Sequence, residues 1–275
     1  MQPVRPRSSP LVILVTALVI AAGSFVYRFN TLEGPLAGFD NDHFGQLVRA
    51  MAMLDGEQPM RDFADAELRA LWPAPTYSVS AAAQRNLGRS LRSEAVLSVG
   101  MLSLGAALLF WVSTRFAGAV APAFVCALLA VLLRPALYNY PKIVVYVLGF
   151  SAMWAYARRQ STIRLAALAA VVAAGALYRH DHGVLLAIAA AVLVVLIHGR
   201  GAMRPMMALG GICLLFMLPG FVSAQINGGL IAYLRECLAV SRQEGARTAS
   251  TRVALTIDRR QRLLVRSEEH TSELQ

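Results

Sequence analysis

Two carboxylates, Asp40 and Asp42, lie two positions apart shortly after the first apolar stretch of the chain. A carboxylate beside a membrane surface is a candidate to accept a proton from a reacting hydroxyl group. Side chains at positions i and i+2 of an extended segment share a face, so the two carboxylates are also candidates to hold a divalent cation together. Asp42 and Asp40 are therefore candidate catalytic residues.

A short amphipathic helix is predicted directly after these carboxylates. Its apolar residues recur at helical spacing and are Leu47, Ala50, Met51 and Leu54. Asp42 lies at or near the position of the N-cap, where a carboxylate accepts hydrogen bonds from backbone N–H groups. Gly56 and Pro59 are expected to end the helix. A role as N-cap would account for the position of Asp42 without catalysis, but one carboxylate is able to cap a helix and also act as a catalytic base.

A second polar cluster, Arg179, His180, Asp181 and His182, interrupts two long apolar runs. Ionisable residues at such a place are costly unless they are paired or reach water. In one interpretation Arg179 and Asp181 simply pair within a turn. In the other, Arg179 binds a phosphate group together with the histidines, because the planar guanidinium donates to two oxygens at once.

Lys142 stands at the start of another apolar run, close to Tyr138 and Tyr140. The tyrosines are typical of the aromatic belt at a membrane boundary. The lysine either extends to lipid headgroups or binds the phosphate of a lipid substrate.

The elements that carry these residues are predicted to be membrane-spanning helices. The chain is 57% hydrophobic and only 15% charged, with a mean hydropathy of +0.53, which is too apolar for an ordinary soluble domain. About seven runs are long enough to cross a bilayer. They are residues 11–27, 95–114, 117–133, 143–157, 163–178, 183–197 and 206–224. The expected fold class is an all-α polytopic membrane protein with a long first outer loop, residues 28–94, that contains short amphipathic helices.

The distribution of arginines predicts the orientation of these spans. If the N-terminus is cytoplasmic, the short inner segments hold a basic set that obeys the positive-inside rule: Arg5, Arg7, Arg115, Arg158, Arg159, Arg164, Arg200 and Arg204. The formal charge of +10 is then explained by topology, and no nucleic-acid partner is expected. Both polar clusters would emerge on the outer face of a bacterial inner membrane.

The first outer loop resembles the opening of GT-C glycosyltransferases, above all the protein mannosyltransferase and aminoarabinose transferase families. The similarity lies in an outward Asp after the first helix, followed by Ala-Met, Gly56, Pro59 and Arg61-Asp62-Phe63. When these shared residues are aligned with the family pattern, Asp42 falls at the position of the family's catalytic Asp, and Arg61 becomes a candidate substrate-binding residue. The chain departs from the family pattern at His43, which replaces the second acid, and at Met60, which replaces an aromatic residue.

The resemblance implies an inverting glycosyltransferase with Asp42 as its general base. The donor would be a sugar on a polyprenyl phosphate, and the acceptor a lipid, glycan or protein. Arg179, His180, Asp181, His182, Lys142 and Arg61 are the expected substrate-binding residues, and a divalent cation on Asp40 and Asp42 is the one cofactor considered. A transporter or flippase-like protein and an inactive membrane fragment are the alternatives.

The C-terminal region is expected to lie outside this membrane domain. Residues 1–227 form the predicted transmembrane domain, and residues 228–265 are expected to begin a following outer segment. The last ten residues, 266–275, match the translation of a common sequencing adapter, so we expect them to be an artefact and the natural protein to continue beyond residue 265.

Overall fold

The computed structural model describes residues 9–31, 39, 41–62, 74–133, 140–235, 237–239 and 242. The regular elements of this part are helices, which confirms the predicted fold class at that level. They are α1 (Pro10–Asn30), α2 (Asn41–Leu54), α3 (Ala74–Leu87), α4 (Leu91–Ala117), α5 (Val120–Leu132), α6 (Tyr140–Arg158), α7 (Thr162–Tyr178), α8 (His180–His198), the 3-10 turn η2 (Gly199–Gly201) and α9 (Met203–Asn227). Residues 230–235 and 237–239 are also helical.

Six of the seven predicted spans each fall within one helix, and the exception is the run 117–133. Four helices of the described chain are both long and apolar enough to cross a membrane: α1, α4, α8 with its η2 extension, and α9. The other three predicted spans lie in α5, α6 and α7. The 13 residues of α5 and the 17 residues of α7 are at or below the low end of the roughly 17–25 residues that cross a bilayer.

Two predicted boundaries were wrong. The run 117–133 does not form one span, because Gly118 adopts a left-handed conformation (φ 68°) that ends α4 at Ala117, and α5 begins only at Val120. The predicted outer loop, 28–94, is shorter at both ends. α1 continues to Asn30, and α4 already begins at Leu91, where the side chain of Ser90 caps its first turn.

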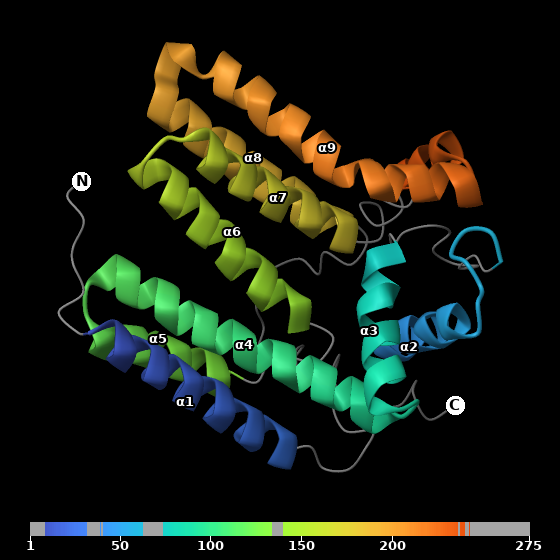
Figure 1. Ribbon diagram of the computed structural model, residues 1–275, viewed down its shortest axis with the longest axis horizontal. Helices are drawn as coiled ribbons and strands as arrows, with labels where there is room; N and C mark the ends of the chain where they lie inside the picture. The colour runs from blue at the N-terminus through green and yellow to red at the C-terminus, as the bar shows by residue number, and fades with distance from the viewer. Residues whose placement is uncertain are drawn as a thin grey trace, which may run out of the picture.

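The lengthwise helices form two groups that α6 joins (Figure 1). α1, α4 and α5 pack around buried residues such as Phe110 and Ala123, whereas α7, α8 and α9 pack around Leu168, Ala190 and their neighbours. α6 contacts both α4 and α7. Many large apolar side chains on the outer faces of these helices are exposed, as expected for surfaces that face lipid.

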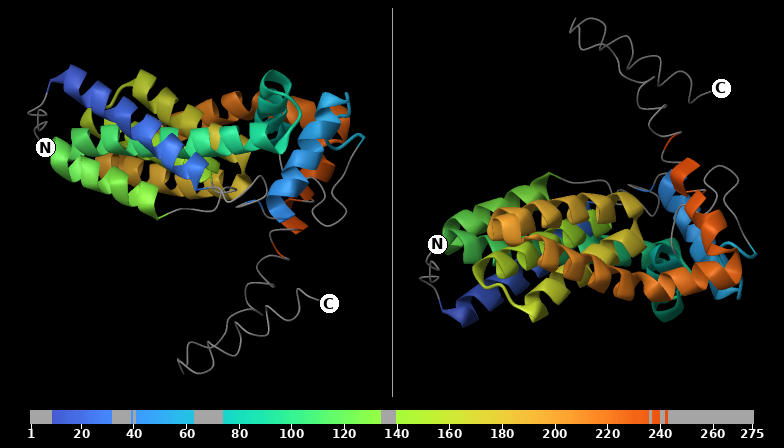
Figure 2. Two further views of the ribbon diagram at one scale, coloured as in Figure 1. Left: turned by 90° about the horizontal axis from the view of Figure 1, so that it is seen from below. Right: turned by 90° about the horizontal axis from the view of Figure 1, so that it is seen from above.

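Successive helices alternate in direction, so their connections gather at two ends of the bundle. α2, α3 and the helical residues 230–235 lie across one end, as both views in Figure 2 show. The α7–α8 connection and the start of α6 lie at this same end, whereas the connections after α4, α6 and α8 lie at the opposite end (Figure 1). The first end is called the capped end and the second the arginine end, because it carries Arg115, Arg158, Arg159, Arg164, Arg200 and Arg204.

Candidate functional site

The first helix of the capped end carries Asp42. The backbone of Asp42 belongs to the first turn of α2, and this helix confirms the predicted amphipathic helix. The side chain of Asp42 and all of Asp40 lie outside the described residues. Asn41 and Asp42 are already helical, and the predicted alignment of Asp40 with Asp42 lies outside the described residues. The general base and the divalent cation therefore stay predictions.

His43, the next residue, joins a buried polar cluster that the sequence did not predict. Its Nε2 lies 3.1 Å from Glu94 Oε1 of α4. Gln84 Nε2 of α3 donates to Glu94 Oε2 at 3.3 Å, and Ser80 Oγ donates to the same oxygen. All four side chains are almost fully buried. The cluster ties α2, α3 and α4 together and thereby holds the first turn of α2, where Asp42 lies.

The second candidate, Arg179, lies between α7 and α8 in an extended conformation. Its backbone N–H donates to Gly175 O of α7, and its carbonyl accepts the N–H of Gly183 in α8. Its side chain is paired: Nε donates to Asp181 Oδ1 at 2.8 Å. The same carboxylate oxygen accepts the backbone N–H of His182 at 3.0 Å. The predicted pairing of Arg179 with Asp181 is thus present in the structure.

The two histidines of this turn point to different partners. His180 Nε2 lies 2.6 Å from the hydroxyl of Tyr233 and 3.3 Å from Cys237 Sγ. His182 is buried, and its Nδ1 lies 2.8 Å from the hydroxyl of Tyr146 in α6. The structure therefore does not bring His180 and His182 onto one ligand. Positions i and i+2 of a helix do not face each other.

Lys142 and Tyr233 complete the surroundings of this turn. Lys142, in the first turn of α6, is close enough to His182 to act on it electrostatically. Tyr233 is buried, and burial raises the pKa of its phenol well above the ordinary value, because the low-polarity surroundings disfavour the phenolate. Tyr233 therefore stays protonated at physiological pH. The sequence did not single out Tyr233 or Cys237.

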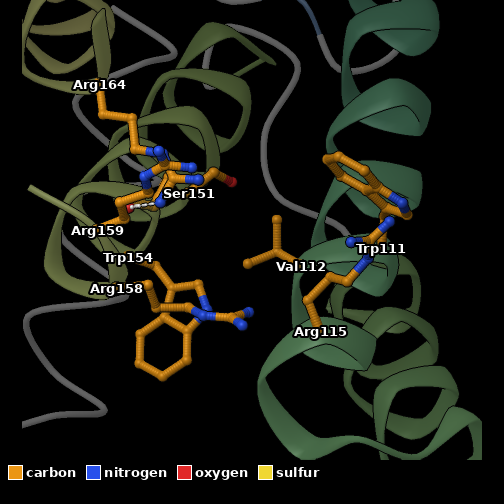
Figure 3. Close-up of a pocket in the computed structure, with 9 residues that line it drawn as sticks. Trp111, Val112, Arg115, Ser151, Trp154, Arg158, Arg159 and Arg164 are labelled. Atoms are coloured by element: carbon orange, nitrogen blue, oxygen red, sulfur yellow. Dashed lines mark hydrogen bonds between the residues drawn. The ribbon is translucent and has the colours of Figure 1, made fainter. Parts of the chain in front are cut away.

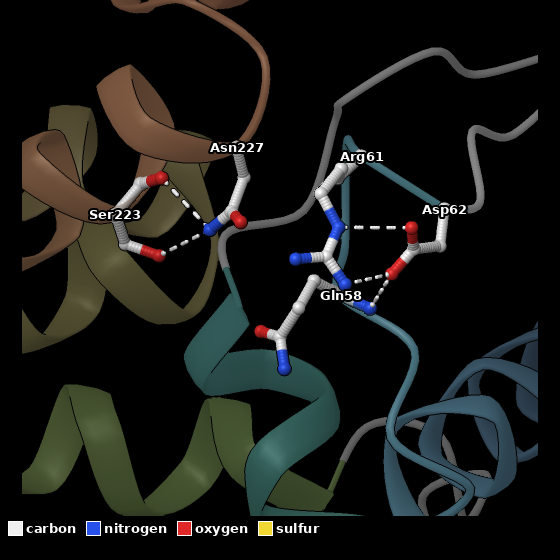
Figure 4. Close-up of polar contacts among 5 residues, drawn as sticks. All are labelled: Gln58, Arg61, Asp62, Ser223 and Asn227. Carbon is white, nitrogen blue, oxygen red and sulfur yellow. Dashed lines mark hydrogen bonds and ion pairs between the residues drawn. The ribbon is translucent and has the colours of Figure 1, made fainter.

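Arg61 is engaged with its neighbour Asp62. Its Nε and a terminal nitrogen donate to the two carboxylate oxygens at 2.9 and 2.6 Å, and the backbone N–H of Gln58 also donates to this carboxylate at 2.8 Å. The guanidinium and this N–H lower the pKa of the Asp62 carboxyl to about 2, and the same pairing raises the pKa of Arg61. Figure 4 shows the pair facing Asn227 at the end of α9.

Two hollows meet at His180. The first, of about 300 Å³, lies at the capped end, where Met60, Ser78 and Tyr233 contribute to its wall. The second, of about 510 Å³, is an apolar groove between α7, α8 and α9. It is lined mainly by small or apolar side chains, among them Ala176, Val184, Ala187, Leu209 and Met217. The groove thus begins beside the Arg179 turn and continues between α8 and α9.

Among the described residues, no three His, Cys, Asp or Glu side chains gather in a way that would hold a metal ion. No protein family, curated protein or solved structure matches this chain. In the described part of the chain, the fold and the site define a helical protein with four candidate membrane-crossing helices and a polar cap at one end.

Proposed function

We propose that the protein is a membrane glycosyltransferase that moves a sugar from a polyprenyl-phosphate donor to an acceptor at the capped end. The observation that carries the proposal is the apolar groove that begins at His180, next to Arg179. A polyprenyl phosphate is a long apolar chain ending in a charged group. A groove of this kind beside a guanidinium matches both halves of such a molecule.

In this proposal the lipid tail lies in the groove between α7, α8 and α9, and the donor phosphate meets Arg179 and Lys142. Arg179 is about one-third exposed and Asp181 about half exposed. An exposed ion pair of this kind contributes only about 0–1 kcal/mol, so a phosphate is able to compete with Asp181 for the guanidinium. Lys142, on the adjacent start of α6, adds a second positive charge.

The reaction follows from the two charged positions. Asp42 accepts the proton of the acceptor hydroxyl as that oxygen attacks the anomeric carbon of the sugar. The bond between this carbon and the phosphate oxygen breaks, and the lipid phosphate leaves with the electron pair and a growing negative charge. Arg179 and Lys142 stabilise that charge. Attack opposite the leaving group inverts the anomeric carbon.

The proposed orientation puts the arginine end and the N-terminus in the cytoplasm of a bacterium and the capped end outside its inner membrane. The capped end then corresponds to the outer face of a GT-C enzyme. α5, α6 and α7 would complete the seven spans of that architecture as shorter helices packed against the long ones.

A transporter is less well supported than an enzyme. A substrate path through the membrane would require ionisable side chains near the middle of the spanning helices. In α4, the basic and acidic residues are Arg92, Glu94 and Arg115, which lie within its first and last turns. α9 carries Arg204 in its first turn and no later charged residue.

The assay uses membranes that contain the full chain and a polyprenyl-phosphate donor with a radiolabelled sugar. Asp42→Asn should lower transfer by about 10²- to 10⁴-fold, which is the usual contribution of a general base. Asp55→Asn is the matched control, because Asp55 is an exposed carboxylate just after the same helix and should leave transfer unchanged. Full transfer by Asp42→Asn would refute the proposed base.

A labelling experiment tests the geometry separately. Cys126, Cys213 and Cys237 are replaced by alanine, and single cysteines are introduced as Asp42→Cys and Arg179→Cys. An impermeant maleimide should label both positions from the periplasmic side. Labelling of positions 42 and 179 from opposite sides would exclude a shared donor site.

A further inference from the structure

A pocket of about 440 Å³ lies at the arginine end, opposite the proposed donor site. α4 contributes Trp111 and Arg115 to its wall, and α6 contributes Trp154 and Arg158. Arg159 and Arg164, on the connection to α7 and its first turn, complete the basic lining. Figure 3 shows these side chains on both sides of the opening.

In the part of the chain that the structure describes, no carboxylate forms an ion pair with the arginines of this pocket. The sequence has no Asp or Glu between Glu94 and Asp181, a stretch that includes all four arginines of the pocket. Among the described residues, Arg164 donates to the carbonyl of Ala155 at 2.7 Å and Arg115 lies 5.1 Å from the centre of the Trp111 ring. Neither partner carries a negative charge, so a bound anion would balance the positive charge of these arginines.

Trp154 contributes its ring, and not its N–H, to the wall of the pocket. Its side chain is partly buried, and its indole Nε1 is fully buried. The polar groups that line the pocket and can bind an anionic oxygen are therefore the guanidinium groups around it.

Aromatic residues beside the pocket favour a lipid over a free anion. The ring of Phe116 lies 5.0 Å from that of Trp154 and 6.1 Å from that of Phe150. Phe116 and Phe150 are exposed on the outer faces of α4 and α6. Phe116 lies in the last turn of α4 and Phe150 near the middle of α6, so an apolar surface leads from the pocket along both helices, and this surface would contact acyl chains.

We infer that the arginine-end pocket binds the phosphate headgroup of an anionic membrane lipid such as phosphatidylglycerol. The guanidinium groups bind the phosphodiester oxygens, and the acyl chains lie along the exposed faces of α4 and α6. Basic pockets between membrane helices on the cytoplasmic side are suited to such headgroups. This site is separate from the proposed donor site and does not depend on glycosyltransferase activity.

Tryptophan fluorescence gives a direct test, because two of the three tryptophans of the chain line the pocket. The full chain carrying Trp72→Phe is purified in neutral detergent and titrated with short-chain phosphatidylglycerol. Phosphatidylcholine of the same chain length and inorganic phosphate are titrated in parallel. We expect a saturable change with phosphatidylglycerol that the other two titrants do not produce.

Paired variants distinguish a specific site from a generally basic surface. Arg158→Gln/Arg159→Gln should weaken phosphatidylglycerol binding by at least about tenfold, because charge-assisted hydrogen bonds are lost. Arg200→Gln/Arg204→Gln removes equal charge from the same end but not from the pocket, and should leave the affinity unchanged. Circular dichroism checks folding, and Arg159→Gln alone replaces the double variant if that variant does not fold.

Three outcomes would overturn the inference. The first is an absence of any response to phosphatidylglycerol beyond that to phosphatidylcholine in the unsubstituted pocket. The second is equal weakening by both arginine pairs, which would indicate general surface charge. The third is an equal response to inorganic phosphate, which would make the ligand a free anion and not a lipid.

Discussion

His43 Nε2 of α2 lies 3.1 Å from Glu94 Oε1 of α4, and each side chain is only 1% exposed. A buried carboxylate is tolerated because several donors satisfy it, and Ser80 and Gln84 of α3 supply two more. The pair holds the start of α2 against the first turn of α4. It therefore fixes the backbone position of Asp42, the residue before His43.

The first prediction concerns the stability that this cluster provides. Glu94→Ala removes the common acceptor of three buried donors and should lower the free energy of unfolding by about 3 kcal/mol. Asp55→Ala is the control, because the Asp55–Arg89 ion pair is at least half exposed and should contribute less than about 1 kcal/mol. Unfolding of the detergent-purified protein measures both; similar losses would contradict a structural role for Glu94.

The sequence predicted α2 and the place of Asp42 because helical spacing and helix-ending residues are local signals. It did not predict the contact of His43 with Glu94, which are 51 residues apart. Which histidine meets which carboxylate depends on how α2 packs against α4. The sequence did contain one signal for a buried partner of Glu94. This isolated acid stands at the start of an apolar run, and such a group requires a partner when it is buried.

The second prediction concerns the close contact of α7 and α8 at the candidate site. A Cβ added at Gly183 would clash with the Cβ and the backbone Cα of Ala176 in α7. The backbone cannot move aside as a flexible side chain would. Gly183→Ala should therefore destabilise the protein by about 1–3 kcal/mol and shift the Arg179 turn.

A matched glycine serves as the control for this substitution. No atom of the described residues lies within 4 Å of a Cβ added at Gly211 in α9. Gly211→Ala should stabilise the protein by up to about 1 kcal/mol through helix propensity. Thermal unfolding of the two variants should give shifts of opposite sign, and a Gly183→Ala protein as stable as the wild type would contradict the observed packing.

The third prediction concerns the pH dependence of the Arg61–Asp62 pair. The pKa of Asp62 falls from its ordinary 3.8 to about 2 in the folded protein. A lowered carboxyl pKa contributes stability above the unfolded value, and this contribution is lost as the pH falls from about 4 toward about 2. Both side chains are well exposed, so the contribution is small.

Carbon NMR of the Asp62 carboxyl measures this shift directly, with Asp62→Asn identifying the signal. Arg61→Gln should move the titration midpoint up toward 3.8, because it removes the guanidinium that is the main cause of the shift. Arg61→Lys should leave the midpoint between these values, since a lysine keeps the charge but not the two-pronged contact. An unchanged midpoint in Arg61→Gln would contradict the pairing.

The helical character of the seven apolar runs followed from composition alone. Their exact ends did not, because a single backbone conformation at Gly118 decides where α4 stops and α5 starts. At the candidate site, the sequence left two interpretations of Arg179 open. The structure adds that Arg179 is paired with Asp181, which turns the phosphate interpretation into a question of competition between two anions.

The fourth prediction uses that competition and depends on the proposed function. Arg179→Ala should weaken donor binding by about tenfold or more, because a charge-assisted hydrogen bond to phosphate is lost. Asp181→Asn should have the opposite effect and strengthen binding, because it removes the carboxylate that competes for the guanidinium. The amide oxygen of Asn is still able to accept the His182 N–H, so this hydrogen bond in the first turn of α8 is kept. Donor affinity is measured by equilibrium binding of a radiolabelled polyprenyl-phosphate sugar. A purely structural ion pair would weaken binding in both variants alike, and that result would exclude Arg179 as the phosphate ligand.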